Sequence, residues 1–177
     1  PTYYEFVLGN PNAKVTVVEY ASVTCPHCAK FEPIAEDLKK SLPEGVPMKK
    51  NPVAFLGREM GPEMQRAYAV ANLLNVEGKL TPAIFDKIHT QRQVPQSRAD
   101  VKQIFVDNGV PAEEFDGAVD SFAVSGMVSQ FDRNTESYNV RGVPAFLVNG
   151  KYMVKIESIT SQEQFNQLVK FLLAKKD

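Results

Sequence analysis

The spacing of hydrophobic residues changes along the chain, and each change marks a different kind of element. Residues 15–20 form a β-branched and aromatic run, which predicts a buried strand. Helical spacing begins at Pro26 and ends before Gly45. Residues 46–55 predict a second strand, made irregular by the two prolines within it. The first third of the chain therefore has the order strand, helix, strand.

A long helical block follows, from residue 57 to about residue 138. Its apolar residues recur at helical spacing, and capping and stopping residues divide it into several helices. The predicted helix starts are Pro62, Thr81 with Pro82, Ser97 and Pro111, the predicted stop is Gly109, and a last helix spans about 121–138. This block predicts a separate helical unit.

Strand character returns at residues 144–148, just before the pair Asn149 and Gly150. This pair is a strong hairpin signal, and residues 151–156 predict the returning strand. Thr160 and Glu163 form a predicted capping box for a C-terminal helix. Strands on both sides of a helical block predict an α/β domain that is interrupted by a helical insertion.

The amino-acid composition excludes several classes of function. The chain has 177 residues, of which 44% are hydrophobic, enough to form a core without disulfide staples. Lys and Arg number 20 against 21 Asp and Glu, which is not the basic excess of a nucleic-acid-binding protein. No stretch approaches the ~18 apolar residues that a membrane-spanning helix needs. Because the chain begins at Pro1 without a secretory signal pattern, we expect that a signal peptide was either removed or never present.

The strongest chemical signal is Cys25-Pro26-His27-Cys28, which follows the first predicted strand and opens a helix. Free N–H groups and the helix dipole stabilise an anion at a helix N-terminus, so Cys25 should form a more stable thiolate than an ordinary cysteine. Pro26 has its φ angle preset for a first helical turn, and His27 can place a positive charge or a donor beside the sulfur. Cys28 lies one turn further in and should be shielded. We expect Cys25 to be the attacking and attacked sulfur, and Cys28 to be the resolving one.

Two other interpretations of the cysteines remain open, namely inert buried thiols and half of a metal site. The two histidines of the chain are His27, inside the motif, and His89, which we expect to be a surface residue of the helical block. A closed zinc site needs four ligands within reach. We therefore favour redox chemistry at the cysteine pair, with no metal and no bound cofactor.

Several motifs resemble the bacterial DsbA family of thiol–disulfide oxidoreductases. They are residues 18–20, the CPHC tetrapeptide with residues 31–32, residues 42–46, residues 48–50 with Val53 and Phe55, and residues 141–145 followed by 148–152. The matches stretch across most of the chain, although the helical middle matches only in pattern. The resemblance implies a thioredoxin-like domain at residues 1–56 and 139–177, and an inserted all-helical domain at residues 57–138.

The resemblance also implies a function. The chain would be a protein dithiol oxidase that donates its Cys25–Cys28 disulfide to unfolded or folding secreted proteins. It would act as a monomer in the periplasm, in a mature form without its signal peptide, and a membrane partner similar to DsbB would reoxidise it. The alternatives are a disulfide isomerase or reductase, a non-enzymatic peptide-binding module with idle thiols, and a metal-binding domain.

The same resemblance assigns roles to residues around the motif. Pro144 is expected to be a cis-proline that faces the sulfurs, which leaves the backbone of Val143 free to pair with an extended substrate. Glu19 is expected beneath the active site, where it helps to move protons to and from the buried cysteine. Lys50 and Glu32 are expected to form a charge network with it. The residues alone leave open an alternative in which Glu19 ends its strand facing water.

The chain differs from the best-known family members at the lip of the motif. Those members carry aromatic residues just before the first cysteine and after the second, where this chain has Val23, Thr24 and Ala29. Pro52 also stands where some members carry a histidine. We expect the less aromatic lip to alter substrate preference and docking to the reoxidising partner.

Overall fold

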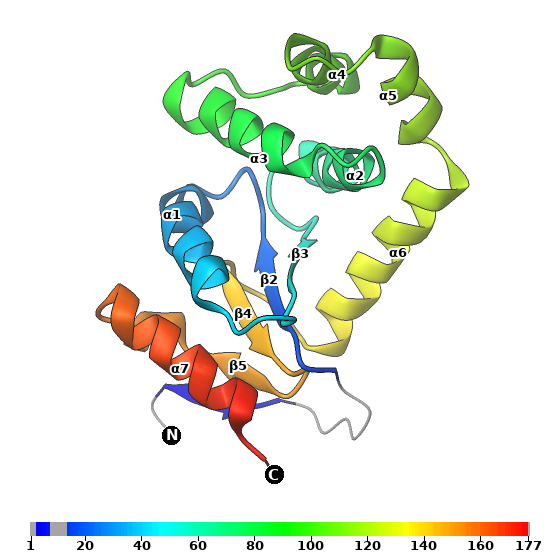
Figure 1. The fold of residues 1–177 in the computed structure, drawn as a ribbon. Helices are drawn as coiled ribbons and strands as arrows, with labels where there is room; N and C mark the ends of the chain where they lie inside the picture. The colour runs from blue at the N-terminus through cyan, green and yellow to red at the C-terminus, as the bar shows by residue number, and fades with distance from the viewer. Residues whose placement is uncertain (1–2, 8–13, 177) are drawn as a thin grey trace.

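The computed structural model describes residues 3–7 and 14–176. Its centre is a five-stranded sheet in the order β1-β5-β4-β2-β3 (Figure 1). The strands are β1 (Tyr4–Phe6), β2 (Val17–Ala21), β3 (Met48–Pro52), β4 (Ala145–Val148) and β5 (Tyr152–Val154). β2 and β3 are parallel, and the other neighbouring pairs are antiparallel. The four predicted strands are present but mostly shorter than expected, and β1 is an edge strand that the hydrophobic pattern does not predict.

Two helices, α1 (Pro26–Ser41) and α7 (Gln162–Ala174), lie together over one face of the sheet (Figure 1). The core between them contains Phe31, Phe146 and Phe165, whose ring centroids are 5.0 to 5.7 Å apart. Val17 of β2 belongs to the same core. Because side chains alternate along a strand, Glu19 shares the face of Val17 and lies beneath α1.

The helical block forms α2 (Met60–Leu73), α3 (Glu77–Phe85), α4 (Arg98–Asp107), α5 (Ala112–Val119) and α6 (Phe122–Ser137). A π-helical turn, Asp86–Thr90, directly continues α3. These helices enclose a hydrophobic core of their own, to which Leu80, Phe105 and Phe115 contribute large buried side chains. Figure 1 shows α6 running from this helical unit back towards the sheet.

Buried polar side chains join the helical unit to the sheet near the end of β3. The side-chain amide of Asn51 donates to Thr135 Oγ1 on α6 at 3.2 Å. The amide of Gln65 on α2 donates to the carbonyl of Pro52 at 3.3 Å and to Asp132 Oδ1 at 2.8 Å. These hydrogen bonds satisfy polar groups that would otherwise be costly to bury, and they fix the helical unit against β3.

Several predicted helix boundaries are confirmed. Ser97 is the N-cap of α4, and its Oγ accepts from the N–H of Asp100 at 3.2 Å. Gly109, with φ +90°, follows α4 in the left-handed conformation that ends many helices. Pro111 directly precedes α5, and Ser121 caps α6. Ser97 and Ser121 make their caps with their own side chains, whereas Gly109 and Pro111 act through the backbone angles that they allow or fix.

Two predicted helix starts at prolines are wrong. α2 begins at Met60, so Pro62 lies within its first turn, where a missing N–H removes no intrahelical hydrogen bond. α3 begins at Glu77, so Thr81 and Pro82 lie inside the helix rather than at its start. The residue before α3 is Val76, which has no capping side chain, and the sequence therefore carries no signal at the true start.

The predicted capping box of α7 is displaced by one residue. Ser161 is the N-cap, and its Oγ accepts from the N–H of Gln164 at 3.1 Å. The Gln164 side-chain oxygen accepts in return from the N–H of Thr160 at 2.6 Å. A glutamine therefore takes the position that was assigned to Glu163, but its side chain accepts from the N–H of the residue before the N-cap rather than from the N-cap itself.

The hairpin turn between β4 and β5 does more than reverse the chain. Asn149 and Gly150 have φ angles of 56° and 63°, as the hairpin signal predicts. The Asn149 side chain is buried, and its amide donates to the carbonyl of Leu173 at 3.1 Å, near the C-terminus of α7. Its Oδ1 accepts from the N–H of Thr16 at 3.3 Å. One side chain thus joins the turn, the start of β2 and the last carbonyls of α7, which have no partner within the helix.

Replacing Asn149 with Gly should lower the free energy of unfolding by about 2 kcal/mol, because it removes these hydrogen bonds while the turn conformation stays accessible. Urea denaturation measures the change. Asn75→Gly is the matched control, since Asn75 also has a positive φ of 62° but is exposed. The control should change stability by no more than about 0.5 kcal/mol. Equal losses in both variants would contradict the account.

Candidate active site

The first cysteine of the motif caps the helix that the motif opens. Cys25 is the N-cap residue of α1, and its Sγ accepts a hydrogen bond from the backbone N–H of Cys28 at 3.3 Å. Pro26 occupies the first helical turn, where its missing N–H removes no helical hydrogen bond. The sulfur therefore lies at the positive end of the helix, where an N–H and the helix dipole both favour a thiolate.

The two thiols are free and differ in exposure. Cys28 is 0% exposed, whereas 8% of Cys25 remains accessible. Burial raises the pKa of the Cys28 thiol, the hydrogen bond and charge of Cys25 and the charge of Glu19 raise it further, and the Ser22 backbone lowers it in part. Cys28 therefore holds its proton firmly, and Cys25 is the sulfur that another molecule can reach.

His27 lies on the outer side of the first turn of α1. Its side chain is exposed, and its ring packs edge-on against Phe31 with 6.1 Å between the ring centroids. We expected His27 to place a positive charge or a hydrogen-bond donor beside the Cys25 sulfur. Because the side chain is exposed, solvent and salt weaken its effect on the thiolate.

A second loop faces the cysteines from across the site. The Val143–Pro144 peptide bond is cis, as the family resemblance implies. The Sγ of Cys25 lies 3.8 Å from the carbonyl oxygen of Val143, towards which the thiol is directed. Val143 also packs against the small cluster that contains both cysteines. The backbone of this loop is therefore adjacent to the reactive sulfur.

The structure brings the three expected charged residues together. Glu19 on β2 pairs in register with Lys50 on β3, and Lys50 Nζ lies 3.8 Å from Glu19 Oε1. The same Nζ donates to Glu32 Oε1 on α1 at 2.9 Å. Glu19 is only 2% exposed, so the alternative in which it faces water is wrong.

Glu19 is a carboxylate with incomplete compensation for its burial. Its Oε2 has no hydrogen-bond partner among the described residues. Burial raises the pKa of Glu19 from its ordinary value of 4.5 to about 7, because desolvation outweighs the attraction of Lys50, and Glu32 and Glu36 raise it further. Burial alone would lower the pKa of Lys50, but Glu19 and Glu32 raise it, so Lys50 stays charged. Glu19 can therefore gain or lose a proton near neutral pH.

His89 is not the surface residue that the sequence analysis expected. It is half-buried, and its Nε2 lies 2.7 Å from the carbonyl oxygen of Val23, in the loop before Cys25. Phe85, one turn earlier, is buried in the same cluster as both cysteines. The spacing of Phe85 and His89, four residues apart, indicates a shared helix face, but it does not show that this face meets the cysteine loop.

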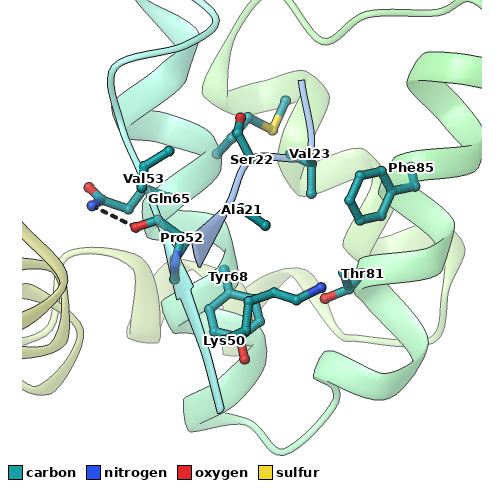
Figure 2. A pocket seen from close by; sticks show the side chains of 11 residues that line it. Ala21, Ser22, Val23, Lys50, Pro52, Val53, Gln65, Tyr68, Thr81 and Phe85 are labelled. Carbon is teal, nitrogen blue, oxygen red and sulfur yellow. Dashed lines mark hydrogen bonds between the residues drawn. The ribbon is translucent and has the colours of Figure 1, made fainter. Parts of the chain in front are cut away.

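A small cavity lies between part of this loop and the helical unit. Its volume is about 20 Å³, room for about one water molecule. Figure 2 shows Val23 and Phe85 at one end of it, with Lys50, Tyr68 and Thr81 at the other. The cavity therefore lies between the loop that precedes Cys25 and the charged side chain of Lys50.

The residues that replace the family's aromatic lip are small, and Val23 and Ala29 both pack against the cysteine cluster. Val23 also packs against the core of the helical unit. Thr24 Oγ1 lies 2.7 Å from Ser22 Oγ, so this hydroxyl is engaged within the loop. Pro52, at the position of a histidine in some members, ends β3 and accepts a hydrogen bond from Gln65.

The described residues contain neither a metal-binding cluster nor a membrane-spanning helix. Within residues 3–7 and 14–176, no group of three His, Cys, Asp or Glu side chains lies close enough together to hold a metal ion. Within the same ranges, no helix has the length and apolar character needed to cross a membrane.

Comparison with known proteins agrees with this geometry. The family model described as a DSBA-like thioredoxin domain matches residues 16–170. A thiol:disulfide interchange protein DsbA from Pectobacterium carotovorum is 42% identical over 169 residues, covering 90% of this chain and 81% of the relative. The protein of the same name from Escherichia coli K12 is 37% identical over the same shares of the two chains.

Solved structures give the same answer for the fold. The crystal structure of the disulfide oxidoreductase DsbA from Proteus mirabilis superposes with a TM-score of 0.88 at 35% identity, covering 98% of this chain and 95% of that one. A complex of the Proteus protein with a non-covalently bound peptide, PWATCDS, gives a TM-score of 0.90 at 33% identity, with coverage of 97% and 96%. The chain thus belongs to the DsbA family and is a thiol–disulfide oxidoreductase with a thioredoxin-like fold.

Proposed function

We propose that this oxidoreductase works as a dithiol oxidase, donating a Cys25–Cys28 disulfide to exported proteins as they fold. The observation that carries the proposal is the hydrogen bond from the Cys28 N–H to Cys25 Sγ at the N-terminus of α1. This interaction stabilises a thiolate, which exists only after the disulfide has been donated. The dithiol form is then favoured, and the disulfide form is a strong oxidant.

The reaction consists of two thiol–disulfide exchanges, with the cysteine pair as the electron acceptor. A substrate thiolate attacks Cys25 Sγ, because Cys28 is fully buried, and forms a mixed disulfide. The Cys25–Cys28 bond breaks, and Cys28 leaves as a thiolate that takes up a proton. The second substrate thiol loses its proton and attacks its partner sulfur, which releases Cys25 as a thiolate. The substrate is oxidised by two electrons, and the pair is reduced by two.

We assign substrate contact to the loop at Val143 and Pro144. An extended peptide can pair with free backbone groups as an added strand, and Val143 lies within 3.8 Å of the reactive sulfur through its carbonyl. A substrate cysteine held there would be close to Cys25. The peptide complex of the Proteus relative supports a peptide as the ligand of this fold.

We assign to Glu19 the transfer of protons to and from Cys28. Its pKa of about 7 suits both directions, and its negative charge is felt by the Cys28 thiol. A groove of about 440 Å³ is lined by Glu19, Glu32 and Lys50, which gives the carboxyl a route for proton exchange with solvent. Lys50 would limit the rise in the pKa of Glu19, and Glu32 would hold Lys50 in place through their ion pair. His27 would add a salt-sensitive contribution to the thiolate.

The cellular setting follows from the chemistry of the proposed reaction. Donated disulfides persist only in an oxidising compartment, for which we propose the periplasm. Each turnover leaves the cysteines reduced, so a reoxidising partner is required, and we propose a membrane protein similar to DsbB. We propose that the chain acts as a monomer, because the site described above is built from one chain.

The assigned roles predict opposite behaviour of the two cysteine variants. Cys28→Ala should form a mixed disulfide with a peptide disulfide and retain it, because the resolving thiol is gone. Cys25→Ala should react at least ~tenfold more slowly, since its remaining thiol is buried and protonated. Mass spectrometry of the adducts and the wild-type redox equilibrium with glutathione test the proposal. Equal rates for the variants, or a potential near the ≈ −270 mV of the reductant thioredoxin, would contradict it.

Replacing Glu19 with Gln should change how stability depends on pH. Because the pKa of Glu19 is raised from 4.5 to about 7 in the folded protein, its folded form binds the proton more tightly than its unfolded form. The contribution of Glu19 to the free energy of unfolding is most favourable below pH 4.5 and declines as the pH rises towards 7. Above pH 7 the ionised Glu19 destabilises the folded protein by about 3 kcal/mol. Glu19→Gln should therefore be more stable than the wild type at pH 8, with little difference at pH 4. Urea denaturation at both pH values measures this, and a pH-independent difference would contradict it.

The same variant tests the proton transfer. The dithiol protein is mixed with glutathione disulfide, and stopped-flow quenching follows the mixed disulfide at Cys25 until Cys28 resolves it. Glu19→Gln should slow resolution by at least ~tenfold, whereas formation of the mixed disulfide should be nearly unchanged. Unchanged resolution would show that Glu19 serves only the fold.

A further inference from the structure

We propose that His89 is a positioning residue of the active site, which fixes the carbonyl of Val23 and thereby the loop that presents Cys25. The proposal deepens the oxidase function proposed above and rests on it. It assigns to the helical unit a direct part in setting the reactivity of the cysteine pair.

The first observation is a short hydrogen bond between the two parts of the protein. His89 Nε2 lies 2.7 Å from Val23 O. A carbonyl oxygen can only accept, so the proton in this bond belongs to His89 Nε2, which acts as the donor. Val23 precedes Cys25 by two residues, and His89 comes from the helical unit far along the chain.

The second observation is that the hydrogen bonds of Ser22, of Thr24 and of the Cys25 N–H are local. Ser22 Oγ lies 2.7 Å from Thr24 Oγ1 and accepts from the Thr24 N–H at 3.2 Å. The N–H of Cys25 donates to the carbonyl of Ser22 at 3.1 Å. These bonds define the shape of the loop, whereas the bond from His89 ties it to a different part of the fold.

The third observation is that packing behind the loop is incomplete. The cavity of about 20 Å³ borders both Val23 and Phe85, and Figure 2 shows the two side chains facing each other beside it. A void leaves its lining without contacts on one side, so it restrains the loop less than a filled core would. Val23 packs against the core of the helical unit and against the cysteine cluster, and the hydrogen bond from His89 adds a directed restraint on its carbonyl.

The fourth observation is how the ring of His89 is presented. His89 lies in the π-helical turn Asp86–Thr90, and the N–H of Gln91 donates to the carbonyl of Asp86 at 2.9 Å. Isolated π turns within helices recur at functional sites. The imidazole lies against Phe85 in a tilted arrangement, with 34° between the ring planes and 6.0 Å between the centroids, and Phe85 is buried beside the cysteines. The donor is therefore held by a ring that is itself fixed.

Loss of this donor should weaken the site in a definite direction. A loop that moves more freely holds Cys25 Sγ less firmly against the Cys28 N–H, and that bond favours the thiolate. The dithiol form should lose stability relative to the disulfide form. The protein should become less oxidising, while its overall fold is retained.

Two substitutions separate the donor from the ring. His89→Phe keeps an aromatic ring against Phe85 but cannot donate, whereas His89→Gln places an amide N–H the same number of bonds from the backbone. Thr90→Ala, at an exposed position of the same turn, is the control. For each full-length variant we would measure the glutathione redox equilibrium and the urea midpoint.

The expected result is a graded series. His89→Phe should shift the glutathione equilibrium about threefold towards the disulfide form, or ~14 mV. His89→Gln and Thr90→Ala should stay close to the wild type. Equal shifts in the Phe and Gln variants, or no shift in any variant, would overturn the proposal. A wild-type potential typical of a reductant would overturn the oxidase function instead, and the order of the variants would still decide the role of His89.

Discussion

The active site depends on one short hydrogen bond, between the backbone N–H of Cys28 and the sulfur of Cys25 at 3.3 Å. It makes the reactive sulfur the N-cap of α1, so the helix that packs on the sheet also stabilises the charge that the reaction produces. The surrounding structure keeps this arrangement in place. The Val143–Pro144 loop approaches the sulfur from one side, and the loop from β2 reaches it from another. Folding and reactivity are thus set by the same helix terminus.

Burial divides the chemistry among three groups. Complete burial keeps Cys28 protonated and out of reach, which directs attack to Cys25. The same environment raises the pKa of Glu19 to about 7, so a group able to exchange protons near neutral pH lies beneath the thiol that needs them. The unpaired Oε2 of Glu19 is a cost to stability that an apolar or amide side chain would avoid. Its presence in a well-packed sheet is consistent with a functional role.

Sequence reasoning succeeded where a single side chain creates the local structure. The cysteine motif, the N-cap Ser97 and the Asn149-Gly150 turn are such cases. Glu19 was placed beneath the motif by the family resemblance alone. Sequence reasoning failed where the decisive partner is distant in the chain. Nothing near His89 indicates that its ring meets the Val23 carbonyl, and nothing near Asn149 indicates the end of α7. The start of α3 was missed because no side chain caps it.

The central claim is that the helix terminus stabilises the sulfur of the reduced protein, and the stabilities of the two redox forms test it directly. An ordinary disulfide that closes so short a loop would stabilise a protein by about 2 kcal/mol through the unfolded chain. A stabilised thiolate acts in the opposite direction, because it exists only in the dithiol form. Urea denaturation of both forms at pH 7 should therefore give a higher midpoint for the dithiol form. A more stable disulfide form would contradict the account.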